Sequence, residues 1–301
     1  MNVGISAVTK STTVSPAAGS MLRRAGRKTL GLPAGLGFAA LLALSYSNAA
    51  WAQTEPNLGS DSTFGLVAST LTNTNAATTV NGDACFTTGP GTAYTLNGTQ
   101  TVPCSAQVGS DQSAALATLN GQACTSLGAG AVTLDTVVVG LNPAGTIPPG
   151  CYSAGGAMNI TTLATVTLSG NGVYIFRAGG PLGIGASSTI ALTNGAAAAH
   201  VYWAPGSAAT FGASATFAGT IIDAAGITFG HLANLTGRAL VFGGTITADA
   251  NIISVPAPAP PVPPPIAAPT LSSWALILFA GILAVVGFAV VRRRARSAAH
   301  R

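Results

Sequence analysis

Along residues 53–255, hydrophobic and polar residues alternate in short stretches that are separated by glycine. Alternation with a period of two is typical of β-strands, because successive side chains of a strand point to opposite faces. The pattern therefore predicts a body made of many short strands joined by tight turns.

One segment departs from this alternation and favours a helix. Ser110 or Asp111 can cap its start, the segment 114–119 continues it, and Gly121 stands where a C-terminal cap belongs. Leu116 and Leu119 share a face, so we expect the helix to lie along the strands rather than in solvent.

The strand pattern is also repeated along the chain. Residues 209–219 recur as 227–237, and earlier copies begin at Met158 and Leu182. A third strand completes each copy, starting near Val173, Val201, Thr220 and Ala239. Three short strands per repeat are typical of one turn of a solenoid. We predict an all-β fold, a three-sided β-solenoid (β-helix) with one α-helix packed alongside; an immunoglobulin-like sandwich would not explain the stacked repeats.

Alternation within each repeat assigns the side chains to stacked columns. The inward columns are Ile160, Ile184, Phe211 and Phe229 on one side, and Val166, Ile190, Phe217 and Leu235 on the next. The outward columns next to the second set are Thr165, Thr189, Thr216 and Asn234, then Thr167, Ala191, Ala218 and Thr236. Another side carries Asn159, Gly183, Thr210 and Thr228. We expect glycine at the corners to permit the sharp bends.

The N-terminal segment is typical of a secretory signal peptide. A basic cluster at 23–28 precedes an apolar run at 30–44, and Ala50-Trp51-Ala52 follows. Residues 1–52 are therefore predicted to be cleaved after Ala52, with Met1 and Met21 both open as the true start. An N-terminal membrane anchor is the alternative, which the short run and the Ala-x-Ala site disfavour.

The C-terminal segment is typical of a membrane anchor. Residues 256–269 are rich in proline and predict a stiff, extended linker. The uncharged run 274–291 is just long enough to span a bilayer. Arg292, Arg293, Arg294 and Arg296 follow it and should stay in the cytoplasm. Residues 270–301 thus predict a transmembrane helix with a basic tail.

Charge and composition narrow the choice of partners. The formal net charge is +5, but the only bases between Gln53 and Pro269 are Arg177 and Arg238. The body is therefore acidic, and nucleic acid is not expected as a partner. With 48% hydrophobic and 6% charged residues, a charged disordered chain is also excluded.

Several segments carry a family resemblance. Residues 148–153, 172–176, 210–212 and 237–240 resemble the ice-binding-protein-like β-solenoid family, and 58–83 is similar to its opening strands. The resemblance implies a discontinuous solenoid, with a single helix along one side, that binds an ice crystal surface.

A second resemblance concerns the tail. Residues 268–274, the apolar run and the arginines resemble the IPTL-type C-terminal sorting signal of Gram-negative bacteria, with Ala268 in place of isoleucine. This implies an exosortase-like sorting protease as a partner. It also implies a place in the cell envelope or on the cell surface, with the protein anchored there or released after processing.

The cysteines, aspartates and histidines of the body are expected to have structural rather than catalytic roles. Cys85, Cys104, Cys124 and Cys151 form an even set, which indicates disulfides in an exported protein. Four cysteines allow three pairings, and we favour Cys85–Cys104 with Cys124–Cys151. Their spacing fits no metal motif, and neither a metal nor a cofactor is expected. The aspartates are isolated and His200 and His231 lie near no nucleophile, so no catalytic residues and no enzymatic activity are expected.

The threonine columns suggest how the body acts. Threonine is stiff at χ1, so a threonine column holds hydroxyls and methyls at fixed spacings and can order water as ice does. We predict ice contacts at Thr165, Thr167, Thr189, Thr216, Asn234 and Thr236. Threonine is also a common outward residue on any strand. A surface adhesin or a structural envelope solenoid without ice activity is therefore the alternative.

Overall fold

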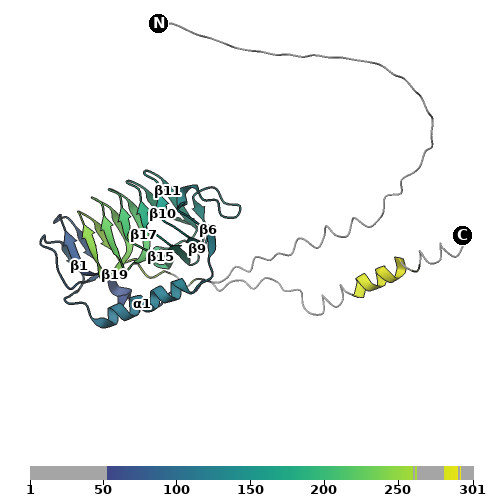
Figure 1. The fold of residues 1–301 in the computed structure, drawn as a ribbon, viewed down its shortest axis with the longest axis horizontal. Helices are drawn as coiled ribbons and strands as arrows, with labels where there is room; N and C mark the ends of the chain where they lie inside the picture. Colours follow the sequence, from purple (N-terminus) through teal and green to yellow (C-terminus); the bar gives the residue numbers. More distant parts are fainter. Residues whose placement is uncertain (1–52, 260–261, 263–280, 291, 293–301) are drawn as a thin grey trace, which may run out of the picture. The chain divides into compact units, whose positions relative to one another are not determined.

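The computed structural model describes residues 53–259, 262, 281–290 and 292 (Figure 1). The predicted signal peptide, most of the linker, and residues 274–280 and 291 of the predicted membrane span lie outside these residues. Residues 281–290 are helical. Among the described residues, no helix is both long enough and apolar enough to cross a membrane.

The body is a β-solenoid whose 20 strands form one continuous parallel sheet. Face A comprises β7 (Val132–Thr133), β10 (Met158–Ile160), β13 (Leu182–Ile184), β16 (Ala209–Phe211), β18 (Gly226–Phe229) and the later parts of β19 (Asn234–Ala248) and β1 (Phe64–Asn73). Face B comprises β8 (Thr146–Ile147), β11 (Thr165–Ser169), β14 (Thr189–Thr193), β20 (Ile252–Ser254), β2 (Thr79–Asn81), β4 (Thr95–Asn97) and the starts of β17 (Thr216–Ile222) and β19. Face C comprises β6 (Thr125–Gly128), β9 (Gly150–Ala154), β12 (Tyr174–Ala178), β15 (Val201–Pro205), β3 (Asp83–Cys85), β5 (Gln100–Thr101) and the remaining parts of β17, β19 and β1.

The strand register confirms the predicted inward columns. Ile160, Ile184, Phe211 and Phe229 are successive partners across face A. On face B, Val166 pairs with Ile190 and Phe217 pairs with Leu235. All of these side chains are buried. The predicted three-sided solenoid is therefore confirmed.

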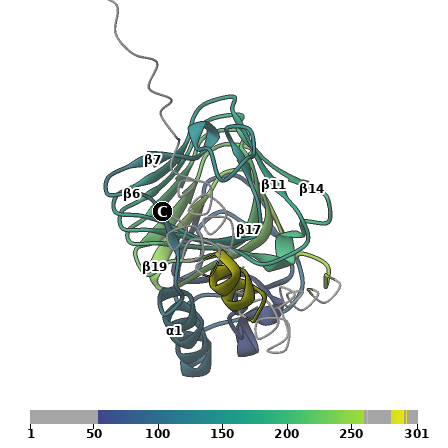
Figure 2. The same ribbon diagram turned by 90° about the vertical axis from the view of Figure 1, so that its right-hand side faces the viewer.

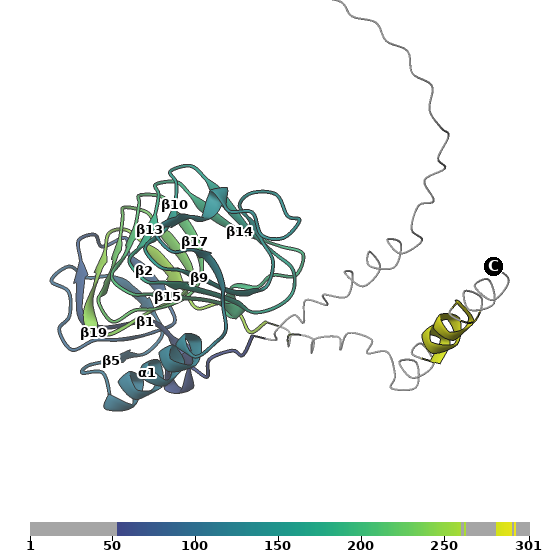
Figure 3. The same ribbon diagram turned by 45° about the vertical axis from the view of Figure 1, so that its right-hand side comes forward.

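The coils are not stacked in chain order. β1 inserts between β19 and β3, so the first strands of the chain close the end at which the repeats finish. The helix α1 (Ala106–Asn120) then takes the chain to the other end, where β6, β7 and β8 begin the repeats (Figures 1 and 3). At about 1.5 Å per residue, its 15 residues span roughly 22 Å, or about four to five coils. The solenoid is therefore discontinuous, as the resemblance implies.

The predicted start of the helix is wrong, whereas its end is confirmed. α1 begins at Ala106 with Ser105 as its N-cap, and it ends at Asn120 with Gly121 as its C-cap. The early turn contains Gly109, a weak helix former. A Cβ on Gly109 would lie 2.4 Å from Cε1 of Phe242, so the packing against that ring favours the extra turn and requires glycine.

The prediction that glycine permits the bends at the corners is confirmed between faces B and C, where Gly170, Gly195 and Gly219 have positive φ. It needs correction at the corner between faces A and B. Between faces A and B, the residues with left-handed backbone angles are Leu163, Ser187, Ser214, Leu232 and Ala250. The nearby Gly212 serves a different purpose, because a Cβ on it would lie 2.4 Å from the amide nitrogen of Ala186 on the neighbouring coil. Glycine at this corner therefore permits close approach of the coils rather than an unusual φ.

Both predicted disulfides are confirmed, as Cys85–Cys104 and Cys124–Cys151. Cys104 lies just before α1 and Cys124 just after it, while Cys85 in β3 and Cys151 in β9 belong to face C. The two bonds therefore fasten both ends of the helix to the same face.

Candidate functional site

The predicted outward residues lie together on face B. Thr165, Thr189, Thr216 and Asn234 are successive partners in one column. In the second column, Thr167 pairs with Ala191, and Ala218 pairs with Thr236. The two alanines interrupt the second column, so only Thr167 and Thr236 of these four residues offer hydroxyls.

The polar side chains of these columns are available to solvent. Thr165, Thr216, Asn234 and Thr236 are exposed, and Thr167 and Thr189 are half-buried. None of these six side chains hydrogen-bonds another described residue of the protein. Their hydroxyl and amide groups can therefore bind water without breaking a protein contact.

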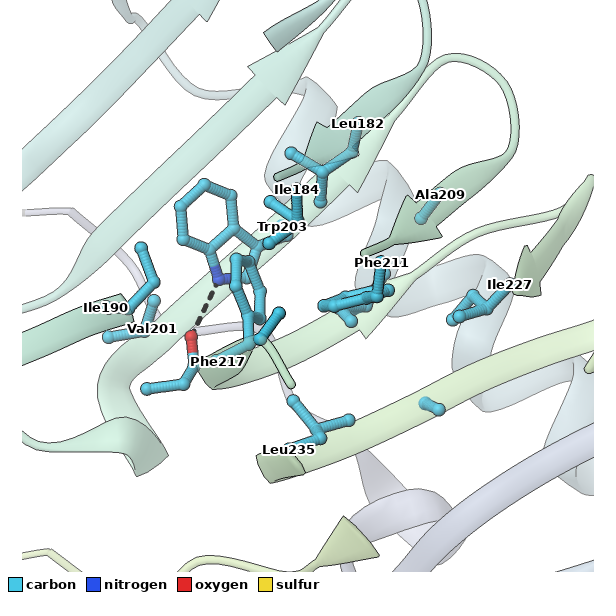
Figure 4. Packing of buried hydrophobic residues seen from close by; sticks show 14 of the residues in the cluster. Leu182, Ile184, Ile190, Val201, Trp203, Ala209, Phe211, Phe217, Ile227 and Leu235 are labelled. Carbon is cyan, nitrogen blue, oxygen red and sulfur yellow. Dashed lines mark hydrogen bonds between the residues drawn. The ribbon is translucent and has the colours of Figure 1, made fainter. Parts of the chain in front are cut away.

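Aromatic packing beneath face B holds its strands in place (Figure 4). The ring of Phe217 lies 4.8 Å from Trp203 and 5.0 Å from Phe211, centroid to centroid. Nε1 of Trp203 donates a hydrogen bond of 2.9 Å to the carbonyl oxygen of Ala218, on the strand that carries Thr216. The outward side chains therefore stand on a fully packed support.

Face B extends beyond the predicted residues onto β20, β2 and β4. The second column continues through Ser254, Asn81 and Asn97. Nδ2 of Asn97 donates to Oδ1 of Asn81 at 2.7 Å, and Nδ2 of Asn81 donates to Oγ of Ser254 at 2.8 Å. Sequence reasoning missed these residues because they come from outside the repeats. The polar–apolar–polar triplets at 79–81 and 95–97 are their only signal.

Face A carries a narrower polar column. The predicted Asn159, Gly183, Thr210 and Thr228 are partners there, and the column continues through Thr247 and Thr72. However, β10, β13 and β16 have three residues each and point only one side chain outward, whereas β11 and β14 have five.

Face C is covered by α1. Its outward residues Ile175, Tyr202 and Leu240 are buried in one cluster with Ala115 and Leu119 of the helix. Figure 2 looks along the axis on which the coils stack. In this view α1 lies outside β6 and β19, whereas β11 and β14 lie on a different side of the solenoid. A large flat ligand therefore has access to faces A and B but not to face C.

Two of the described aspartates, Asp61 and Asp111, lie close enough to influence each other. Burial, assisted by the nearby Asp111, raises the pKa of Asp61 to about 7. These two aspartates are thus closer than the sequence predicted, but Asp61 has no exposed surface. Hydrogen bonds from the side chain and amide of Ser60 lower the pKa of Asp111. Among the described residues, no group of three or more His, Cys, Asp or Glu could hold a metal ion.

The two histidines that we predicted to be structural or solvated each have an acidic neighbour. His200 is buried and contacts Glu55 through Nδ1. Nδ1 of His231 lies 3.2 Å from Oδ2 of Asp249 at the exposed corner of faces A and B. Neither histidine faces a nucleophile in these contacts.

Comparison with known proteins decides the family. A sequence model described as ice-binding-like matches residues 57–254. The chain belongs to the ice-binding-like family. A second model, of the IPTL-CTERM motif, matches residues 267–296 of this ice-binding-like protein, so the resemblance of the tail is confirmed as well.

Individual relatives point the same way. The chain is 31% identical over 111 residues to an ice-binding protein of Flavobacterium frigoris, a match that covers 37% of this chain and 40% of that protein. It is similar to the crystal structure of an ice-binding protein from Antarctomyces psychrotrophicus, with a TM-score of 0.61, 30% identity and coverage of 68% and 100% of the two chains. An ice-binding protein from an Antarctic biological consortium gives a TM-score of 0.60, 27% identity and coverage of 68% and 93%.

Proposed function

We propose that this protein is exported, is held at the cell envelope and binds ice through face B. One observation carries the proposal: a member of the ice-binding-like family exposes stacked threonine columns whose hydroxyls have no protein partner. The activity would inhibit the growth or recrystallisation of ice, or attach the cell to it. This assigns a binding role to the fold and no catalytic one.

The geometry of face B suits a crystalline ligand. Adjacent coils of a solenoid are about 4.7–4.9 Å apart, and alternate residues along a strand are about 6.6 Å apart. The first spacing is close to a repeat within planes of ice. Stiff threonine side chains on the packed support of Phe217 and Leu235 hold water in register with that repeat.

Face B is a better candidate than face A because it is wider. β11 and β14 point three side chains outward on face B, whereas β10 and β13 point one outward on face A. Gly183 also leaves a gap in the face A column. The proposed contacts are therefore Thr165, Thr167, Thr189, Thr216, Asn234 and Thr236.

Export and anchoring explain the two ends of the chain. We propose that residues 1–52 direct export and that 270–301 hold the protein in the membrane until an exosortase-like protease processes the tail. The match to the IPTL-CTERM motif supports this, as do the two disulfides, which are typical of oxidising compartments.

Ice recrystallisation in the presence of the purified 53–255 domain tests the activity. An ice-binding protein keeps the grains small, whereas an adhesin for other ligands leaves their growth unchanged. Grain growth equal to that in buffer would contradict the proposal.

A further inference from the structure

The end of face A next to β1 is wider than the rest of that face. There β1 and β19 lie side by side, at the end of the solenoid away from β6 (Figure 1). Outward threonines form two adjacent columns, which we call the face A array. Its members are Thr88, Thr70 and Thr245 in the first column and Thr72, Thr247, Thr228 and Thr210 in the second. β1 and β19 therefore present a threonine–x–threonine pattern in register on neighbouring coils.

The hydroxyls of the face A array are open to solvent. Thr70 and Thr247 are half-buried, and the other members are exposed. None of these side chains hydrogen-bonds another described residue. Thr74, by contrast, donates from its hydroxyl to the carbonyl oxygen of Ala248 at 3.2 Å. The hydroxyls of the array can therefore bind water without breaking a protein contact, and those beyond Thr72 cannot.

Buried side chains hold the strands of the array in place. Beneath the two columns lie the buried side chains of Leu71, Ile246 and Ile227. At the end of β1, the buried side-chain amide of Asn73 donates hydrogen bonds of 2.8 Å to the carbonyl oxygens of Asn75 and Ala93. β1 is thus fixed beside β19, so the register of the columns is kept although the two strands are far apart in the sequence.

We propose that the face A array is a second ice-binding surface. Adjacent coils are about 4.7–4.9 Å apart and alternate residues of a strand about 6.6 Å apart, so the array has the same spacings as face B. No charged side chain stands in either column, and threonine is stiff at χ1, so the hydroxyls can hold water in register. The choice of ice as the ligand rests on the proposed function and on the match to the ice-binding-like family.

Position and size define what the array can do. Faces A and B are different sides of a three-sided solenoid, so a flat crystal plane contacts only one of them at a time. The array has both columns only on β1 and β19, whereas face B has both on β11, β14, β17 and β19. We therefore assign reversible adsorption to the array, while the inhibition of recrystallisation stays with face B.

Uptake of the full-length protein into slowly grown ice tests the array, with serum albumin as the standard for trapping without binding. Thr216→Tyr obstructs face B, and Thr245→Tyr obstructs the array, each at an exposed position. We expect uptake of the wild type well above that of albumin, a partial loss in each single variant, and a loss to the level of albumin in the double variant. Uptake of Thr216→Tyr equal to that of the double variant would overturn the array and leave ice binding through face B intact. Uptake of the wild type no greater than that of albumin would instead contradict the proposed function itself.

Two further variants keep the result interpretable. Thr72→Tyr obstructs the array from β1 and can replace Thr245→Tyr if that variant fails to fold. A folded Thr216→Tyr/Thr72→Tyr protein taken up as well as Thr216→Tyr would also overturn the array. Asn120→Tyr adds the same ring at an exposed position of α1, the helix that covers face C, and should be taken up as the wild type is. A loss in Asn120→Tyr as large as that in Thr245→Tyr would contradict the assignment to face A.

Discussion

Thr189 of β14 and Thr216 of β17 occupy the same position on neighbouring coils of face B. The amide of Thr216 donates a hydrogen bond of 2.9 Å to the carbonyl oxygen of Ser188, and the amide of Thr189 donates one of 2.9 Å to Ala164. The main chain therefore sets the distance between the two side chains. The χ1 angle of threonine is restricted, so its side chain adds little conformational freedom. The stacking of the solenoid coils therefore sets the spacing of the hydroxyls.

The tail should determine where the protein is found. Deleting residues 270–301 removes the apolar run and the arginine cluster, so we expect the domain to appear in the soluble periplasmic fraction or the medium. Immunoblots of membrane and soluble fractions check this. A full-length protein that is equally soluble and keeps its own C-terminus would show that the tail neither anchors nor is processed.

The disulfides should stabilise the solenoid by closing loops. Replacing Cys124 and Cys151 with serine should lower the free energy of unfolding by on the order of 3 kcal/mol, because the bond closes a loop with a sequence separation of 27. Urea unfolding of the variant and the wild type measures the difference. The same change at Cys85 and Cys104 is the matched comparison, with a separation of 19 and a similar expected loss.

The repeats make much of the fold predictable from sequence. Alternation fixes which residues point inward, and equivalent residues of successive copies become partners, so Thr165, Thr189 and Thr216 could be aligned correctly. The helix start could not be predicted, because Gly109 is favoured there by the ring of Phe242, which is distant in sequence.

The missed parts of face B have a similar cause. Asn81 and Asn97 join the face through pairing of β2 with β20 and of β4 with β2, and these strands belong to no repeat. The predicted role of glycine in permitting the bends holds between faces B and C, as at Gly170 and Gly195, but not between faces A and B. There the left-handed positions are taken by residues such as Leu163 and Ser214, while the close approach of the coils, which selects glycine, is not visible in one copy of the repeat.

Gly237→Ala should destabilise the protein strongly. A Cβ on Gly237 would lie 1.8 Å from the carbonyl oxygen of Gly219 on the adjacent coil, which neither strand can avoid without shifting. We expect a loss of about 3 kcal/mol or more in thermal unfolding. Gly91→Ala is the control, since no atom lies within 4 Å of its added Cβ. Equal stability of the two variants would mean that the coils tolerate wider spacing at this corner.

Asp61 should make stability depend on pH. Its pKa is about 7 in the folded state and near 3.8 when unfolded, so the folded state binds more protons between these values. Stability therefore falls as the pH rises through this window. Asp61→Asn should raise Tm relative to the wild type at pH 8, and the difference should shrink towards pH 4.

Asp83 is the matched control for that experiment. The pKa of Asp83 is lowered, chiefly by a hydrogen bond from the amide of Thr99. The ionised carboxylate therefore stabilises the folded state above the unfolded pKa, and this stabilisation is lost as the pH falls. Asp83→Asn should therefore lower Tm at pH 8. A gain in Tm at pH 8 for both variants would contradict the opposite environments of the two carboxyls.

The most direct test of ice binding through face B is the ice recrystallisation activity of Thr216→Tyr. Thr216 is exposed in the middle of the first column, so a tyrosine there should prevent flat contact with ice. We expect the activity to be lost while Tm stays within the small range typical of exposed substitutions. Thr228→Tyr, at an exposed position on face A, should keep full activity. Full activity in Thr216→Tyr together with a loss in Thr228→Tyr would place the site on face A, and full activity in both would contradict ice binding through either column.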